Sequence, residues 1–115
     1  MAKKVFIKEN AKDLFRAILK DIYATEISDG YVEIFGEYLL INHKTQEIMY
    51  FTDSFVDDGR DLHAKEFFKF LAKSRIKFYD YSELIGMCFE AEIHTDGRGN
   101  KLLVPQKICS KPPKI

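Results

Sequence analysis

Apolar and polar residues alternate strictly along residues 87–94. A period of two residues is typical of a β-strand that buries one face and exposes the other. The apolar side consists of Met87, Phe89, Ala91 and Ile93, and the opposite side of Cys88, Glu90, Glu92 and His94. Residues 96–100 (DGRGN) then tolerate positive φ and reverse the chain, and residues 101–108 form a second extended run. The pattern predicts a β-hairpin near the C-terminus.

A second alternating segment covers residues 31–42. Its apolar face consists of Val32, Ile34, Tyr38 and Leu40, and its other face of Tyr31, Glu33, Phe35 and Glu37. Gly36 lies in the middle and predicts a bulge or a sharp bend of the kind that curls a sheet. Residues 43–45 suit a hairpin turn, and residues 46–55 suit its return strand. A second β-hairpin is therefore predicted.

Residues 62–75 (LHAKEFFKFLAKSR) give the clearest helix pattern in the chain. They combine strong helix formers with one predominantly apolar side, and Asp61 is a residue type that caps a helix N-terminus. That side consists of Phe67, Phe70, Leu71 and Ser74. Lys73 and Arg75 suit the negative end of the helix dipole. We expect one amphipathic helix between the two hairpins.

Residues 13–26 fit two different structures. Leu14, Ile18 and Ile22 recur at helical spacing, so the local pattern favours a helix. An extended chain would instead place on one face the residues Phe15, Ala17, Leu19 and Tyr23. The order of the other elements decides the prediction, because a strand here gives the order βββαββ. That is the order of a five-stranded OB-type Greek-key barrel with one α-helix between strands 3 and 4.

The composition is that of one globular domain. The chain has 115 residues, of which 46% are hydrophobic and 14% aromatic, so it can bury a core of its own. We predict a single OB-like domain over residues 1–115, with residues 1–10 and 110–115 flexible. Ten Phe and six Tyr exceed the needs of a small core and predict some exposed rings. Eighteen basic and eighteen acidic side chains cancel, which leaves room only for a local basic groove.

The two cysteines, Cys88 and Cys109, lie on the two predicted C-terminal strands. A disulfide between them is geometrically conceivable, but two free thiols in a reducing cytosol are the favoured interpretation. No apolar run approaches the roughly 20 residues that a membrane-spanning helix needs. The first residues also lack the apolar segment of a signal peptide. These features predict a cytoplasmic protein without a membrane partner.

The sequence shows no pattern typical of an enzyme. His43, His63 and His94 share no metal-ligand spacing with the cysteines, so no metal site is predicted. Glu90 and Glu92 follow from alternation in a half-exposed strand and do not require acid–base chemistry. Phosphate-binding loops and the Gly-x-Ser-x-Gly pattern are absent from the sequence. We predict a non-enzymatic protein without a cofactor.

Four segments together resemble a known family. They are residues 17–21 (AILKD), the aromatic-rich helix at 67–71, residues 81–93 (YSELIGMCFEAEI) and residues 101–108 (KLLVPQKI). The chain resembles the small single-stranded-DNA-binding proteins of bacteriophages that infect Gram-positive hosts such as lactococci. The resemblance implies an OB fold, sequence-nonspecific binding of single-stranded DNA in phage replication or recombination, and assembly into dimers or tetramers. It also implies contacts with phage or host recombination proteins in the cytoplasm of the bacterial host cell.

An OB fold binds its ligand on strands 2 and 3 and on the loops that join strands 1–2 and 4–5. Aromatic rings there would stack on bases, and cations would contact phosphates. The candidate nucleic-acid-binding residues are Tyr31, Phe35, Lys44, Tyr50, Phe51, Arg98 and Lys101. Tyr50 and Phe51 face opposite ways in a strand, so at most one of them can join the same platform.

A different function also fits these residues. Tyr31 and Phe35 would equally suit packing under a subunit interface or the helix. Zero net charge and exposed rings fit a protein–protein interface as well as a nucleic-acid site. The alternative prediction is therefore a small phage interaction module or an inhibitor of a host factor.

Overall fold

The computed structural model describes residues 13–109, so the flexibility predicted for residues 1–10 and 110–115 lies outside the described residues. Five antiparallel strands form one sheet: β1 (Phe15–Glu26), β2 (Val32–Asn42), β3 (Ile48–Asp57), β4 (Cys88–Thr95) and β5 (Lys101–Ile108). The helix α2 (Leu62–Lys73) lies between β3 and β4, and two short 3₁₀ turns are η1 (Ser28–Gly30) and η2 (Tyr81–Leu84). The order across the sheet is β3-β2-β1-β4-β5.

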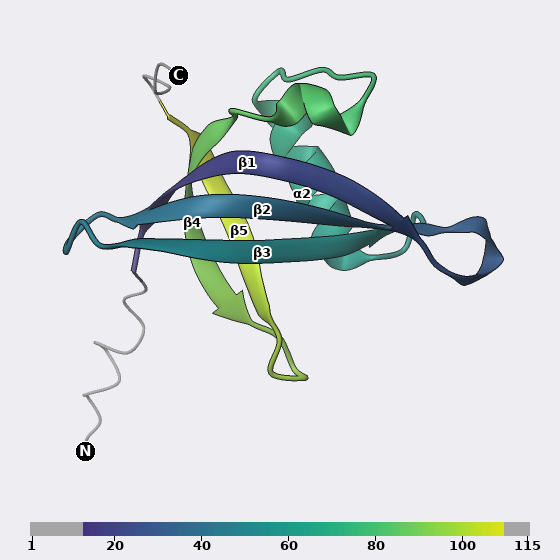
Figure 1. Cartoon of the computed structure of the whole chain (residues 1–115), viewed down its shortest axis with the longest axis horizontal. Coiled ribbons are helices and arrows are strands. Elements are labelled where there is room, and N and C mark those ends of the chain that lie inside the picture. Colours follow the sequence, from purple (N-terminus) through teal and green to yellow (C-terminus); the bar gives the residue numbers. More distant parts are fainter. Residues whose placement is uncertain (1–12, 110–115) are drawn as a thin grey trace.

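The predicted mainly β domain, with its helix between the third and fourth strands, is confirmed. β1 is a strand although its local pattern also fits a helix. It is hydrogen-bonded to β2 on one side and to β4 on the other, so two ladders override the local preference. Figure 1 shows β1, β2 and β3 side by side, with β4 and β5 crossing behind them at a steep angle.

The sheet is not closed into a hydrogen-bonded barrel. β3 and β5 are its two outer strands, and within residues 13–109 no backbone ladder joins them. A side chain makes the contact instead: the backbone N–H of Leu103 on β5 donates to Asp53 Oδ1 on β3 at 3.0 Å. The order and number of the strands are as predicted, while the closing pair of strands stays apart.

One face of the sheet, called the inner face here, holds the core together with α2. The fully buried side chains of largest volume are Phe89, Leu19, Ile34, Leu40, Leu71 and Leu103. The ring of Phe89 makes edge-to-face contacts with Tyr38 on β2 and Phe70 on α2, at centroid distances of 5.7 and 5.4 Å.

Within residues 13–109, no helix is long and apolar enough to cross a membrane.

Of the two alternatives predicted at Gly36, a bulge or a sharp bend, the bulge is wrong. The ladder passes through Gly36 in register, with Ile22 on β1 and Asp53 on β3 as its partners. The glycine is needed for another reason, because a Cβ there would lie 2.9 Å from Tyr38 Cε1. The register shift lies on β1 instead, between Leu19 and Asp21.

The shift on β1 changes which residues share a face. Before it, Phe15, Ala17 and Leu19 point to the inner face, as the alternation predicts. After it, Ile22 packs against the core, and Tyr23 pairs with Phe35 on the opposite face. The predicted common face of Leu19 and Tyr23 is therefore wrong, because one extra residue reverses the alternation that follows.

The favoured interpretation of free thiols is also wrong in this structure. Cys88 and Cys109 are joined by a disulfide, and their Cα atoms lie 5.6 Å apart. Both are buried, in a small cluster with Ile18 that is separate from the main core. The backbone N–H of Cys109 also donates to the carbonyl of Cys88 at 3.2 Å. The end of the last strand is thus fixed to the start of β4.

A buried carboxylate ties together β3, β5 and α2. Asp53 is 6% exposed and accepts hydrogen bonds from Leu103 N–H and from His63 Nε2, which lies 2.8 Å from Oδ2. Burial alone would lower the pKa of His63, but the hydrogen bond and charge of Asp53, with the charge of Asp61, raise it by more. The net result is a His63 pKa above the ordinary value of about 6.5.

Stability should therefore depend on pH through His63. Because its pKa is raised in the folded state, its contribution is complete below the unfolded-state pKa of about 6.5 and is lost as pH rises through the folded-state pKa. Urea unfolding at a series of pH values should show wild type losing stability relative to His63→Gln over that interval. A constant difference between the two proteins would contradict the charged pair.

Candidate nucleic-acid interface

The face of β1, β2 and β3 turned away from the core, called the outer face here, carries a pair of stacked aromatic rings. Tyr23 and Phe35 lie with their ring centroids 5.3 Å apart and their planes 13° from parallel. Tyr23 is exposed and Phe35 is half-buried. The register shift on β1 creates this pair, because it turns Tyr23 toward Phe35. Tyr23 is a candidate residue that the sequence pattern did not identify.

The two aromatic candidates on β3 divide as the alternation predicts. Tyr50 is 81% exposed, whereas Phe51 pairs with Tyr38 and packs against the core. Phe51 is therefore a core residue and does not join the outer face. Tyr31 is exposed just before β2, and its carbonyl accepts a hydrogen bond from Ile27 N–H that closes the η1 turn.

The predicted cations lie in two exposed loops. Lys44 is in the β2–β3 turn, where Asn42 Oδ1 accepts the N–H of Lys44 at 2.8 Å. Arg98 is in the β4–β5 loop and Lys101 is at the start of β5. This loop lies near β3, since Leu103 contacts Asp53 only two residues beyond Lys101. The two loops are at different ends of the molecule, so the structure does not gather these cations into one cluster (Figure 1).

The β4–β5 loop has a defined shape. Asp96 Oδ1 accepts the backbone N–H groups of Arg98 at 2.8 Å and Asn100 at 2.9 Å. The bonds from Asn100 and Arg98 hold the pKa of the Asp96 carboxyl below its usual value. Gly99 has a φ of 86°, which the chain reversal requires. These hydrogen bonds fix the backbone of the turn that carries Arg98, and the Arg98 side chain is exposed.

Two carboxylates also lie on the outer face. Glu37 Oε2 accepts the Tyr23 hydroxyl at 3.1 Å, and Glu33 Oε2 accepts the Ser54 hydroxyl at 3.0 Å. The bond to Glu37 raises the pKa of the Tyr23 hydroxyl above its usual value. Arg16 and Lys20 on β1 add exposed positive charge that the sequence pattern did not select. The outer face is therefore aromatic with mixed charge.

The balance of charge differs between the described residues and the rest of the chain. Residues 1–12 and 110–115 hold six of the 18 basic side chains and one of the 18 acidic ones. Residues 13–109 accordingly carry 12 basic and 17 acidic side chains, a net charge of −5. Attraction of phosphates by this part of the chain must therefore be local.

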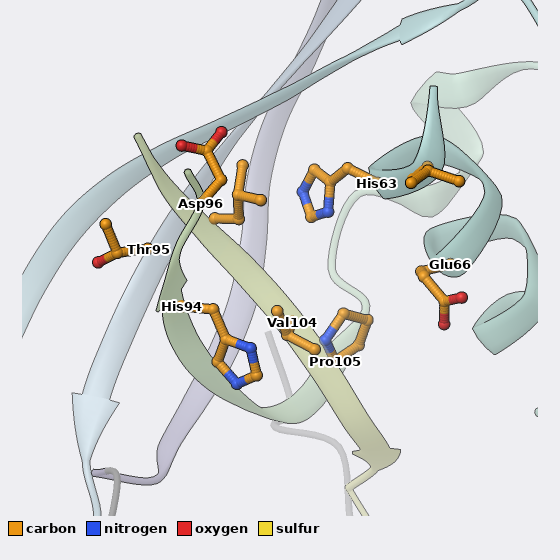
Figure 2. Close-up of a pocket in the computed structure, with 9 residues that line it drawn as sticks. His63, Glu66, His94, Thr95, Asp96, Val104 and Pro105 are labelled. Carbon is orange, nitrogen blue, oxygen red and sulfur yellow. The ribbon is translucent and has the colours of Figure 1, made fainter. Parts of the chain in front are cut away.

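A separate cavity of about 370 Å³ lies between α2 and β5. Figure 2 shows His63 from α2 and His94 from β4 on opposite sides of β5 in this view, with Val104 and Pro105 along the β5 ribbon. Each imidazole is paired with a carboxylate: His63 with Asp53, and His94 with Glu92 at 2.8 Å. Across residues 13–109, groups of three or more potential metal-ligating side chains are absent.

The chain matches no protein-family model, no curated protein and no solved structure. The resemblance to phage single-stranded-DNA-binding proteins therefore stays a prediction from short segments. Within residues 13–109, the exposed rings of the outer face are the groups best placed to stack on a planar ligand.

Proposed function

We propose that this protein binds single-stranded DNA without reading its sequence, on the outer face of β1, β2 and β3. The observation that carries the proposal is the Tyr23–Phe35 stack, with the exposed Tyr50 on the same face. Every base has a π-face, so rings of this kind tolerate any sequence. Each base–ring stack contributes about 1–3 kcal/mol by alanine substitution.

We also propose that the sheet is an OB-type Greek-key fold. The strand order β3-β2-β1-β4-β5, with α2 between β3 and β4, supports this topology. The bond from Leu103 N–H to Asp53 supports a near approach of β3 and β5, the two strands that close such a barrel. In this fold the outer face of β2 and β3 and the β4–β5 loop are the usual ligand surface.

The arrangement of charges suggests a path for the phosphates. Glu37 lies between the Tyr23–Phe35 stack and Tyr50, and Glu33 lies on the other side of Phe35. Both carboxylates would repel a backbone that crossed the centre of the outer face. Lys44 in one loop and Arg98 and Lys101 near the other lie outside that centre. We propose that the bases face the rings while the phosphates pass close to these loops. Sequence-independent coating of single strands in phage replication or recombination, in the host cytoplasm, is the role that this binding would serve.

A fluorescence-anisotropy titration with labelled oligo-dT tests the proposal. Tyr50→Ala should weaken binding on the order of 5- to 150-fold, the equivalent of about 1–3 kcal/mol for one lost stack. Tyr23→Ala should weaken it to a similar extent, because Phe35 then loses its stacked neighbour. Tyr79→Ala is the matched control, since Tyr79 is a fully exposed tyrosine on the segment between α2 and η2.

Salt dependence separates the stacking contribution from the phosphate contribution. Affinity of wild type should fall as salt rises, and Arg98→Ala or Lys101→Ala should each make that dependence shallower by roughly one phosphate contact. The tyrosine variants should keep the wild-type dependence. A lack of binding at low salt, or equal loss in Tyr50→Ala and Tyr79→Ala, would contradict the proposal.

The carboxylates beside the exposed rings favour a second candidate, a protein-interaction module. An outer face with exposed rings and carboxylates suits a basic protein surface. A pull-down from host lysate after nuclease treatment distinguishes the candidates. A host protein that wild type retains after nuclease treatment, and that Tyr50→Ala does not, would favour the second candidate. Loss of all bound proteins after nuclease treatment would favour the first.

A further inference from the structure

β3 is an outer strand of the sheet, and part of its free edge offers unpaired backbone groups. Asn42 N–H donates to Glu47 O at 2.9 Å, which fixes the hydrogen-bonded positions of the β2–β3 ladder. These positions recur at every second residue, so Met49 and Phe51 bond to β2. The N–H and C=O groups of Ile48, Tyr50 and Thr52 must then point away from β2.

The end of the same edge next to α2 is already covered at Val56. Val56 N–H points away from β2 by the same alternation, and it donates to Asp61 Oδ2 at 2.7 Å, beside the start of α2. Within residues 13–109, no hydrogen-bond partner is found for the outward backbone groups of Ile48, Tyr50 and Thr52, or for those of Ser54, which lies next to the covered end. Residues 48–52 are therefore the part of the open edge that lies away from α2.

This open edge lacks the features that normally protect an outer strand. Residues 48–52 (IMYFT) contain no charge and no proline, although Ile48 is 61% and Tyr50 81% exposed. The other outer strand, β5, has Pro105 and two lysines along its length. Charged side chains and proline are the usual means of preventing edge-to-edge pairing. Because residues 48–52 lack both, this short, exposed edge is suited to pair with another β-strand.

We propose that a second copy of this chain pairs antiparallel with β3 along residues 48–52, about a two-fold axis at Tyr50. In this register Tyr50 faces Tyr50 of the partner subunit, and Ile48 faces Thr52 of the partner subunit. Each of these pairs exchanges both N–H···O bonds, so the outward groups of Ile48, Tyr50 and Thr52 all find acceptors and donors. No charges of like sign oppose one another within residues 48–52.

The pairing has a structural reason to favour a copy of the same chain. A two-fold interface uses one patch twice, so the patch must complement itself. Residues 48–52 do so, because an apolar residue at one end meets a small β-branched residue at the other, with a tyrosine at the centre. The two outer faces would become one continuous face with the Tyr50 rings adjacent. This inference concerns assembly and does not depend on nucleic-acid binding.

Sedimentation equilibrium of the full chain tests the dimer and its register together. Wild type should reach the mass of two 13.4 kDa chains at micromolar concentration. Ile48→Lys/Thr52→Lys should be monomeric, because each new lysine would face another across the axis. Ile48→Glu/Thr52→Glu should also be monomeric, and an equimolar mixture of the two variants should recover the dimer. Thr25→Lys/Tyr79→Lys, two exposed positions outside β3, should dimerise like wild type.

A second measurement covers the case in which the charged variants fail to fold. Tyr50→Cys should be joined to its partner by a short bismaleimide, because the axis places the two side chains opposite one another. Tyr79→Cys should not be joined under the same conditions. A wild type that stays at 13.4 kDa up to millimolar concentration would overturn the proposal. A dimer that survives in the lysine variant, or Tyr50→Cys that is not joined, would overturn it too.

Discussion

Asp53→Ala should lower the free energy of unfolding by about 3–5 kcal/mol, because removing one partner of a buried pair leaves the other uncompensated. His63 would lose the carboxylate to which it is bound, and Leu103 N–H would lose its acceptor. A domain of this size has a total stability of about 5–15 kcal/mol, so the loss is a large share. Urea unfolding monitored by circular dichroism measures it, with a fall in Tm of roughly 10–25 °C expected.

The control for Asp53 is a carboxylate without such partners. Asp21→Asn changes an exposed residue of β1 whose carboxylate, within residues 13–109, accepts a hydrogen bond only from the adjacent Ile22 N–H. It should change stability by less than about 0.5 kcal/mol. Asp53→Ala/His63→Leu should recover part of the loss, since no buried partner is then left charged. Equal stability of Asp53→Ala and wild type would mean that β3, β5 and α2 are held together without this carboxylate.

Reduction of the disulfide should destabilise the protein by about 3 kcal/mol. The bond closes a loop with a sequence separation of 21 residues, and the chain-entropy model assigns roughly this value to a loop of that length. Thermal unfolding with and without a reducing dithiol measures the effect. Cys88→Ala/Cys109→Ala should be insensitive to the reductant, which separates bond loss from other effects of the dithiol.

A titration of the thiols bears on where the protein works. Structural disulfides are rare in a reducing cytosol. If the unfolded, unreduced protein reacts with two equivalents of a thiol reagent, the cysteines are free, as the sequence alone suggested. If it reacts with none, Cys88 and Cys109 are paired and the proposed cytoplasmic location needs a mechanism that keeps them oxidised.

The sequence predicts the number, order and faces of most elements because their periodicity is strong. Residues 31–42 alternate, and Ile34, Tyr38 and Leu40 are buried on the predicted face of β2, while Val32 packs half-buried against the core. Asp61 caps α2 as its position implied, accepting His63 N–H at 2.9 Å. β1 required a different argument, since its pattern alone favours a helix and only the order of the remaining elements points to a strand.

The candidate site was less predictable for a physical reason. An extra residue between Leu19 and Asp21 has no signature in composition, yet it reverses the face of every later residue on β1. Tyr23 therefore lies on the outer face, which the sequence pattern did not predict. Asp53 could have been found, because strict alternation with Phe51 and Phe55 places it on the inner face. A carboxylate among buried aromatic positions is a signal that it has fixed partners.

The two oxygens of Asp61 serve two elements at once. Oδ1 accepts N–H groups of the first turn of α2, and Oδ2 accepts Val56 N–H on the outer strand β3. A single carboxylate thereby links the start of the helix to the border of the sheet. Fraying of the helix end and opening of that border are then the same event, so amide hydrogens at Val56 and Ala64 would exchange with solvent at a common rate.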